Sequence, residues 1–148
     1  MKREDLAEYI MDTYDCQQDH PWERYPDYTV FRHTPSRKWF AVVMNVPRSR
    51  LGLCGDDVLD IVNVKCDPAE IEPLLQENGI YPAYHMNKRH WVSAALDGSV
   101  PDEGIRKLVA ISFEATEKAG EKMTSIEAAE KHTEFFGGFP HYCYFVTD

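Results

Sequence analysis

The fold is decided by residues 28–46, which read Tyr-Thr-Val-Phe-Arg-His-Thr-Pro-Ser-Arg-Lys-Trp-Phe-Ala-Val-Val-Met-Asn-Val. Residues 28–33 and 38–46 are rich in β-branched and aromatic side chains, which favour β-strands. Residues 34–37 (Thr-Pro-Ser-Arg) have the composition of a turn. This stretch therefore predicts a β-hairpin with a basic tip.

The segments around this hairpin predict the rest of the fold. Residues 58–65 carry apolar side chains at both alternating sets of positions, which is typical of a central strand. The remaining expected elements are a helix over 3–14, a helix from 67 to 78, an extended run over 80–84, a strand over 90–96 and a helix over 101–120. The order predicts an α+β fold, α-β(3)-α-β(2)-α, with a mainly antiparallel sheet. We expect helices on one face and a partly open opposite face.

The last residues resemble an addition to that unit, so we divide the chain into a domain over 1–118 and an extension over 119–148. A capping-box pattern at 124–127 predicts a further helix that ends near Phe136. Residues 141–146 (His-Tyr-Cys-Tyr-Phe-Val) have strand composition and would promote aggregation if they were exposed. We therefore expect the extension to pack on its own domain or to be exchanged in a homodimer.

Composition excludes several classes of protein. The 148 residues are 43% hydrophobic, which supports one folded domain rather than a disordered chain. No apolar run reaches the length of about 18 residues that a membrane span needs, and the first residues do not resemble an export signal. The four cysteines form no C-x-x-C pair, so we expect free thiols and a cytoplasmic location.

The net charge of −9 argues against a general binder of nucleic acid or membrane, but the charge is unevenly distributed. Residues 21–50 carry +4 and residues 80–96 carry +2, whereas the rest of the chain carries −15. If the two basic segments meet in space, they form one face of distinct character. Otherwise their cations pair with neighbouring acidic helices.

Residues 84–91 (Tyr-His-Met-Asn-Lys-Arg-His-Trp) are the richest in chemically useful side chains. They could form a nucleic-acid-binding wing, line an anion pocket, or make a hairpin tip whose aromatic rings fill the core. Asn63 and Lys65 share one face of a strand. They could form hydrogen bonds with a ligand or with the next loop, and we favour the loop. The candidate DNA- or ligand-binding residues are Arg32, His33, Arg37, Lys38, Asn63, Lys65, Tyr84, His85, Asn87, Lys88, Arg89 and His90.

The sequence contains no G-x-S-x-G, G-x-x-x-x-G-K-[ST], G-x-G-x-x-G or H-E-x-x-H pattern. No catalytic pair is nominated, no metal-ligand spacing is present, and no cofactor is predicted.

Separated motifs make the chain resemble the MmcQ/YjbR family over about residues 1–118. They are Y-H-M-N-K-R-H-W at 84–91, P-D-Y-T-V-F at 26–31, K-W-F at 38–40, N-V-K-C-D-P at 63–68 and L-D-G-S-V-P-D-E at 96–103. The resemblance implies the α-β(3)-α-β(2)-α fold, which is similar to secretion-chaperone and CyaY-like folds. It also implies a small bacterial cytoplasmic protein, with a double-wing mode of DNA binding proposed for the family. The wings here would be 34–38 and 86–89.

Three functions remain open at this point. The first is DNA binding through the two basic hairpins. The second is a protein- or peptide-binding module of the chaperone kind, as a monomer or homodimer. The third is an enzyme or small-anion binder in which His85, Asn87, Lys88 and Asn63 line a pocket.

Overall fold

The computed structural model describes residues 1–121 of the chain. The helix predicted up to Phe136 and the strand predicted over 141–146 therefore lie outside the described residues. The described elements are α1 (Arg3–Thr13), β1 (Cys16–Asp19), β2 (Thr29–His33), β3 (Trp39–Pro47), the 3-10 helix η1 (Arg48–Leu51), β4 (Val58–Lys65), α2 (Pro68–Leu75), β5 (Ile80–Pro82), β6 (Trp91–Ala95) and α3 (Asp102–Glu121).

The six described strands form a single antiparallel sheet in the order β1-β2-β3-β4-β6-β5, so the predicted α+β class is confirmed. Strand β4 lies at the centre, as its two apolar faces predicted. The predicted helix start before α2 is also confirmed, because Asp67 caps the helix by accepting a hydrogen bond from the Ala69 amide at 2.9 Å.

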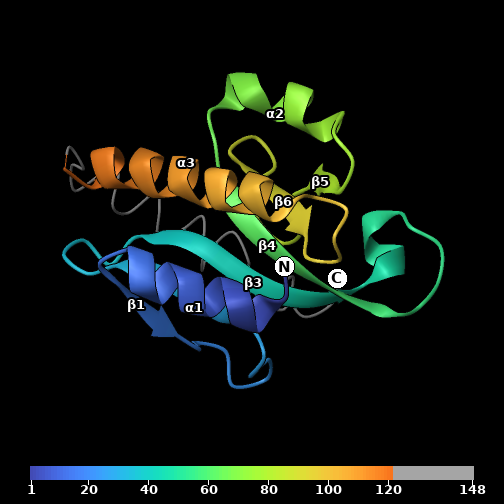
Figure 1. The fold of residues 1–148 in the computed structure, drawn as a ribbon, viewed down its shortest axis with the longest axis horizontal. Coiled ribbons are helices and arrows are strands. Elements are labelled where there is room, and N and C mark those ends of the chain that lie inside the picture. The colour runs from blue at the N-terminus through green and yellow to red at the C-terminus, as the bar shows by residue number, and fades with distance from the viewer. Residues whose placement is uncertain (122–148) are drawn as a thin grey trace.

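Helices α1 and α3 cover one face of the sheet, as Figure 1 shows. Their apolar stripes, which include Leu6, Ile10 and Val109, pack on the strand residues that point toward them, such as Val62 and Val64. A bulge in the β2–β3 pairing brings both Phe40 and Ala41 to this core, although they are adjacent in sequence. Burial of these apolar side chains stabilises the domain.

One strand was missed by the sequence prediction. Residues Cys16–Asp19 form edge strand β1, which pairs with β2 from Cys16 opposite His33 to Asp19 opposite Val30. The segment reads Cys-Gln-Gln-Asp and has no strand propensity of its own. Pairing with β2 and an ion pair between Asp19 and Arg32 hold it at the edge.

The expectation of a partly open second face was wrong. That face carries its own buried cluster, which includes Val42, Met44 and Ile61 from the centre of the sheet. Trp39 and Trp91 are the first residues of β3 and β6, and both belong to this cluster, with exposed fractions of 4% and 1%. The expectation of an open face failed because aromatic residues in irregular loops follow no periodic pattern from which their burial could be predicted.

Candidate functional site

The two basic loops lie at the same end of the sheet. Ala41 of β3 pairs with Val64 of β4, and Lys65 of β4 pairs with Trp91 of β6. The start of β3, the end of β4 and the start of β6 are therefore neighbours. The loop over 34–38 leads into β3 and the loop over 83–90 leads into β6, so the register brings together segments that are about fifty residues apart in sequence.

The loop over 34–38 closes the β2–β3 hairpin tightly. The His33 amide donates to the Lys38 carbonyl and the Arg37 amide donates to the His33 carbonyl, each at 2.9 Å. The turn requires a left-handed backbone at Arg37, where φ is 64°. The loop is also bonded to a neighbouring segment. The Thr34 hydroxyl donates a hydrogen bond to the Asp15 carboxylate at 3.0 Å, and Asp15 lies in the segment that follows α1.

The loop over 83–90 is fixed to the sheet by a buried polar pair, Asn63 and Ser93, which face each other on β4 and β6. The Asn63 side-chain amide donates to the Tyr84 carbonyl at 3.2 Å, and the Ser93 hydroxyl accepts from the Tyr84 amide at 2.9 Å. The Ser93 hydroxyl in turn donates to the Asn63 side-chain oxygen. Both backbone groups of Tyr84 are thereby satisfied, so Asn63 bonds the next loop as predicted.

Asn87 forms the turn in the second half of this loop. Its side-chain oxygen accepts from the Arg89 amide at 2.9 Å, and its carbonyl accepts from the Trp91 amide at 2.9 Å. The side chains of His85 and Met86 are buried, whereas Lys88 and Arg89 are exposed. The loop therefore packs over the second face of the sheet and presents its two cations to solvent.

The cations at this end are Arg37, Lys38, Lys65, Lys88 and Arg89, and we call this set the basic end. Arg37, Lys88 and Arg89 are exposed, and Lys38 and Lys65 are half-buried. The ion pairs described among residues 1–121 involve the N-terminus, Arg3 and Arg32, and none of them uses Arg37, Lys88 or Arg89. The positive charge of these three exposed side chains is therefore directed to solvent.

Other predicted site residues have structural environments. Arg32 pairs with Asp19 at 3.0 Å and its guanidinium lies 5.5 Å from the centre of the Trp39 ring, so it braces the edge of the sheet. His33 is buried, and its Nε2 lies 2.7 Å from the Thr116 hydroxyl. Burial lowers the pKa of His33, against the opposing effect of Glu117. The His90 carbonyl accepts from the Cys66 amide at 2.8 Å and extends the β4–β6 ladder.

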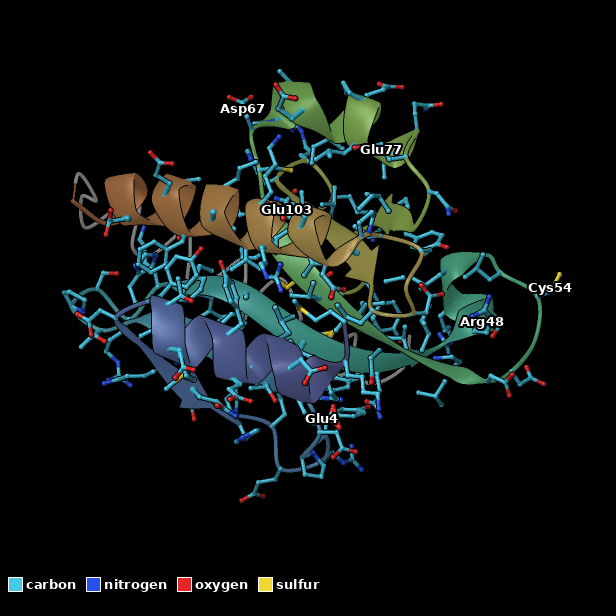
Figure 2. The ribbon with its side chains drawn as sticks, in the orientation of Figure 1. Glu4, Arg48, Cys54, Asp67, Glu77 and Glu103 are labelled. Carbon is cyan, nitrogen blue, oxygen red and sulfur yellow. The ribbon has the colours of Figure 1, made fainter. Side chains whose placement is uncertain are left out.

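The first basic segment does not stay together in space. Arg48 and Arg50 follow the nine-residue strand β3, so about 30 Å of strand separates them from the loop over 34–38. Figure 2 shows Arg48 near Cys54 at one extremity of the molecule, and Asp67 and Glu77 at α2. The charge count along the chain therefore overstated the number of cations at any single site.

Sequence reasoning missed a buried serine that fixes α3 to this end of the sheet. The Ser112 hydroxyl accepts from the Lys65 amide at 2.8 Å and donates to the Phe40 carbonyl at 2.6 Å. It thus bridges β3 and β4 just beyond their last paired residues, Ala41 and Val64. The placement of Ser112 on the inner face of a predicted helix was the one available signal.

The described residues offer little support for other kinds of site. Cys16, Cys54 and Cys66 are free thiols, as predicted, and burial raises the pKa of Cys66 to about 11, which makes it a poor nucleophile. No group of three potential metal ligands gathers within the described part of the chain. Its exposed large apolar side chains are Met11, Val58 and Ile111, on three different elements. No described helix has the length and apolarity for crossing a membrane.

Comparison with known proteins places the chain among uncharacterised bacterial relatives. The model of a family described as YjbR matches residues 3–115. The uncharacterized protein YyaQ of Bacillus subtilis (strain 168) is 40% identical over 116 residues, which are 78% of this chain and 98% of that protein. The uncharacterized protein YjbR of Escherichia coli (strain K12) is 41% identical over 54 residues, 36% of this chain and 46% of that protein.

Among solved structures, the crystal structure of a Pseudomonas syringae protein is similar to this chain, with a TM-score of 0.77 and 41% identity. The similarity covers 78% of this chain and 99% of that one. None of these descriptions states an activity, a ligand or a partner.

Proposed function

This chain belongs to the YjbR family, and we propose that it binds duplex DNA through the basic end. The observation that carries the proposal is the exposure of Arg37, Lys88 and Arg89 from two loops at one end of the sheet, outside the described ion pairs. Cations directed to solvent from two separate loops suit phosphate groups, which supply most of the affinity in non-specific DNA binding.

The spacing of the two loops also suits a phosphate backbone. The starts of β3 and β6 are separated by one strand, β4, and hence by about 10 Å. Lys65 ends that intervening strand, so cations are distributed across the width of three strands. Such a row can contact several phosphates at once, whereas a single compact anion would engage one loop.

Backbone strain is concentrated in the same two loops. Arg37 and His85, with φ of 64° and 58°, are the non-glycine residues with positive φ in the described chain, and each lies in one of the two loops. A left-handed conformation costs about 1–2 kcal/mol for a residue with a side chain. An arginine at a position where glycine is sterically easier supports a role for its charge.

The test is the affinity for a fluorescently labelled duplex of about 20 base pairs, measured by anisotropy between about 50 and 200 mM salt. The full chain should bind with an affinity that falls steeply as salt rises. Neutralising the three exposed cations (Arg37→Asn, Lys88→Gln and Arg89→Gln) should flatten the slope of log K against log salt by about 2.7, because each phosphate that a cation neutralises contributes about 0.9 to that slope.

A matched control separates the site from overall charge. Arg24, Arg50 and Lys107 are also exposed but lie outside the basic end, and their neutralisation changes the net charge by the same amount. This control should keep the wild-type slope. The proposal is wrong if the full chain shows no binding at the lowest salt concentration, or if both triple variants weaken binding equally.

A further inference from the structure

Aromatic rings border the basic end on the second face of the sheet. Trp22, from the loop between β1 and β2, lies edge-on to Trp39 with 5.5 Å between the ring centres. Trp39 is the first residue of β3 and directly follows Lys38, and the Arg32 guanidinium lies 5.5 Å from the centre of its ring. Trp22 is therefore separated from the basic hairpin loop by a single ring.

The other basic loop brings a ring to the same face. Tyr84, in the loop over 83–90, packs against the buried cluster of this face, as do Trp22 and Tyr25. Burial raises the pKa of Tyr28, and the nearby hydroxyl groups of Tyr84 and Tyr25 raise it further. The loop that precedes β2 and the loop over 83–90 therefore meet on this face.

Two of these rings differ in exposure from the rings that fill the core. Tyr28, Trp39 and Trp91 are 5%, 4% and 1% exposed, whereas Trp22 and Tyr84 are half-buried. The half-buried rings cover the sheet with one part of their surface and keep another part in water. They are thus both anchored and accessible to a ligand.

Accessible rings beside exposed cations are the combination that unpaired DNA requires. In proteins that bind single strands, cations hold the phosphates while aromatic side chains stack on the bases. Paired bases within a duplex already stack on their neighbours, and they reach a protein ring only by leaving the helix at an energetic cost. Trp22 and Tyr84 can therefore add affinity chiefly where the DNA offers unpaired bases.

We propose that Trp22 and Tyr84 stack on unpaired bases next to a duplex whose phosphates lie on the basic end. The preferred substrate is then a duplex with a single-stranded overhang. The inference rests on the proposed function and narrows it to one class of DNA. It uses the half-buried rings of the two loops and leaves the buried centre of the face covered as it is.

The test compares three probes that share one duplex. One probe is blunt, one carries an overhang of thymine nucleotides, and one carries an overhang of equal length made of abasic nucleotides. Overhangs at the 3′ end and at the 5′ end form two separate sets. In at least one set, the full chain should bind the thymine overhang about fivefold or more tightly than the abasic overhang, because a stacked base contributes at least that factor.

The outcomes separate this inference from the proposed function. The thymine and abasic overhangs carry the same number of phosphates, so a difference in affinity between them reports the bases. Equal affinity in both sets would overturn the overhang proposal and leave duplex binding intact. Absence of binding to the blunt probe at the lowest salt concentration would refute duplex binding and, with it, the inference that rests on it.

Substitutions locate the effect. Tyr84→Leu and Trp22→Leu keep an apolar cover but cannot stack, so each should reduce the preference for thymine and leave affinity for the blunt probe unchanged. The control is Tyr9→Leu, because Tyr9 is also half-buried beside a cation, with the Arg106 guanidinium 5.5 Å from its ring centre, but lies on α1 at the opposite face (Figure 1). The proposal fails if the Tyr9 variant loses the preference as well, or if both of the other variants retain it.

Tryptophan fluorescence provides a readout in the unaltered chain. Trp22 is the half-buried member of the three tryptophans, so a base that stacks on it should quench the emission. The thymine overhang should therefore quench more than the abasic overhang does. Trp22→Phe should remove this difference in quenching and keep the preference in affinity, because phenylalanine retains a ring. Equal quenching by the two overhangs would contradict stacking on Trp22.

Discussion

Replacing Ser112 by alanine should destabilise the domain far more than the removal of one surface hydroxyl would. The Ser112 hydroxyl bridges the Lys65 amide and the Phe40 carbonyl at 2.8 and 2.6 Å, and the serine has no exposed surface. Alanine leaves a donor and an acceptor without this partner at a buried position. Each such group costs about 1–3 kcal/mol, so the expected reduction in stability is about 2–6 kcal/mol.

Urea unfolding of the full chain measures this reduction. For a slope of about 2 kcal/mol/M, a reduction of about 3 kcal/mol lowers the midpoint by about 1.5 M. That is a large share of the stability of about 5–15 kcal/mol that is typical of a domain. Amide exchange gives a local readout, because the Lys65 amide should exchange faster in the variant while the Val62 amide, deeper in the β3–β4 ladder, keeps its relative protection.

The control is Ser49→Ala, which removes an exposed hydroxyl from η1 and should change stability by less than about 0.5 kcal/mol. If Ser112→Ala lowers the stability no more than this control does, then the Lys65 amide and the Phe40 carbonyl form a hydrogen bond with each other or with water in the variant. The reasoning that the serine replaces a missing rung between β3 and β4 would then be refuted.

Three further substitutions test neighbouring features. Arg37→Gly should relieve the left-handed strain and change stability by less than about 1 kcal/mol in either direction while weakening DNA binding, as urea unfolding and anisotropy would show. Burial lowers the pKa of His33 below 6.5, so the unfolded chain takes up its proton first as pH falls. Stability should therefore decline between about pH 7 and pH 5, and His33→Gln should flatten that decline in unfolding curves. Trp91→Ala should cost about 3–5 kcal/mol, and a cost below about 1 kcal/mol would show that its ring is not packed.

Elements with their own sequence signal were predictable. Strand β4 was predicted at 58–65 and is observed over Val58–Lys65, because its alternating apolar faces are a local property. The start of α2 is local too, because the helix predicted from residue 67 begins where the Asp67 side chain caps it. Strand β1 was not predictable in this way, since Cys16–Asp19 become a strand only through pairing with β2.

The candidate site could be predicted only in part. The bond from Asn63 to the Tyr84 carbonyl followed from a general rule, because a polar group on an apolar strand needs a partner nearby. The contacts Ser112–Phe40 and His33–Thr116 join residues 72 and 83 positions apart, and no local pattern specifies such pairs. The separation of Arg48 from Arg37 likewise depends on the length of β3, which a charge count ignores.

The way the two loops are held bears directly on what their cations can do. Tyr84 is bonded at both backbone groups by Asn63 and Ser93, and the 34–38 turn is closed by two backbone bonds and the Ser36 hydroxyl, which accepts from the Lys38 amide. Loops fixed in this manner lose little conformational freedom when a partner binds, so less of the binding free energy goes into ordering them. The cost that remains is confined to the side chains of Lys88, Arg89 and Arg37. A small ordering cost matters for a chain with net charge −9, because repulsion from its acidic surface opposes any approach to DNA except by the basic end.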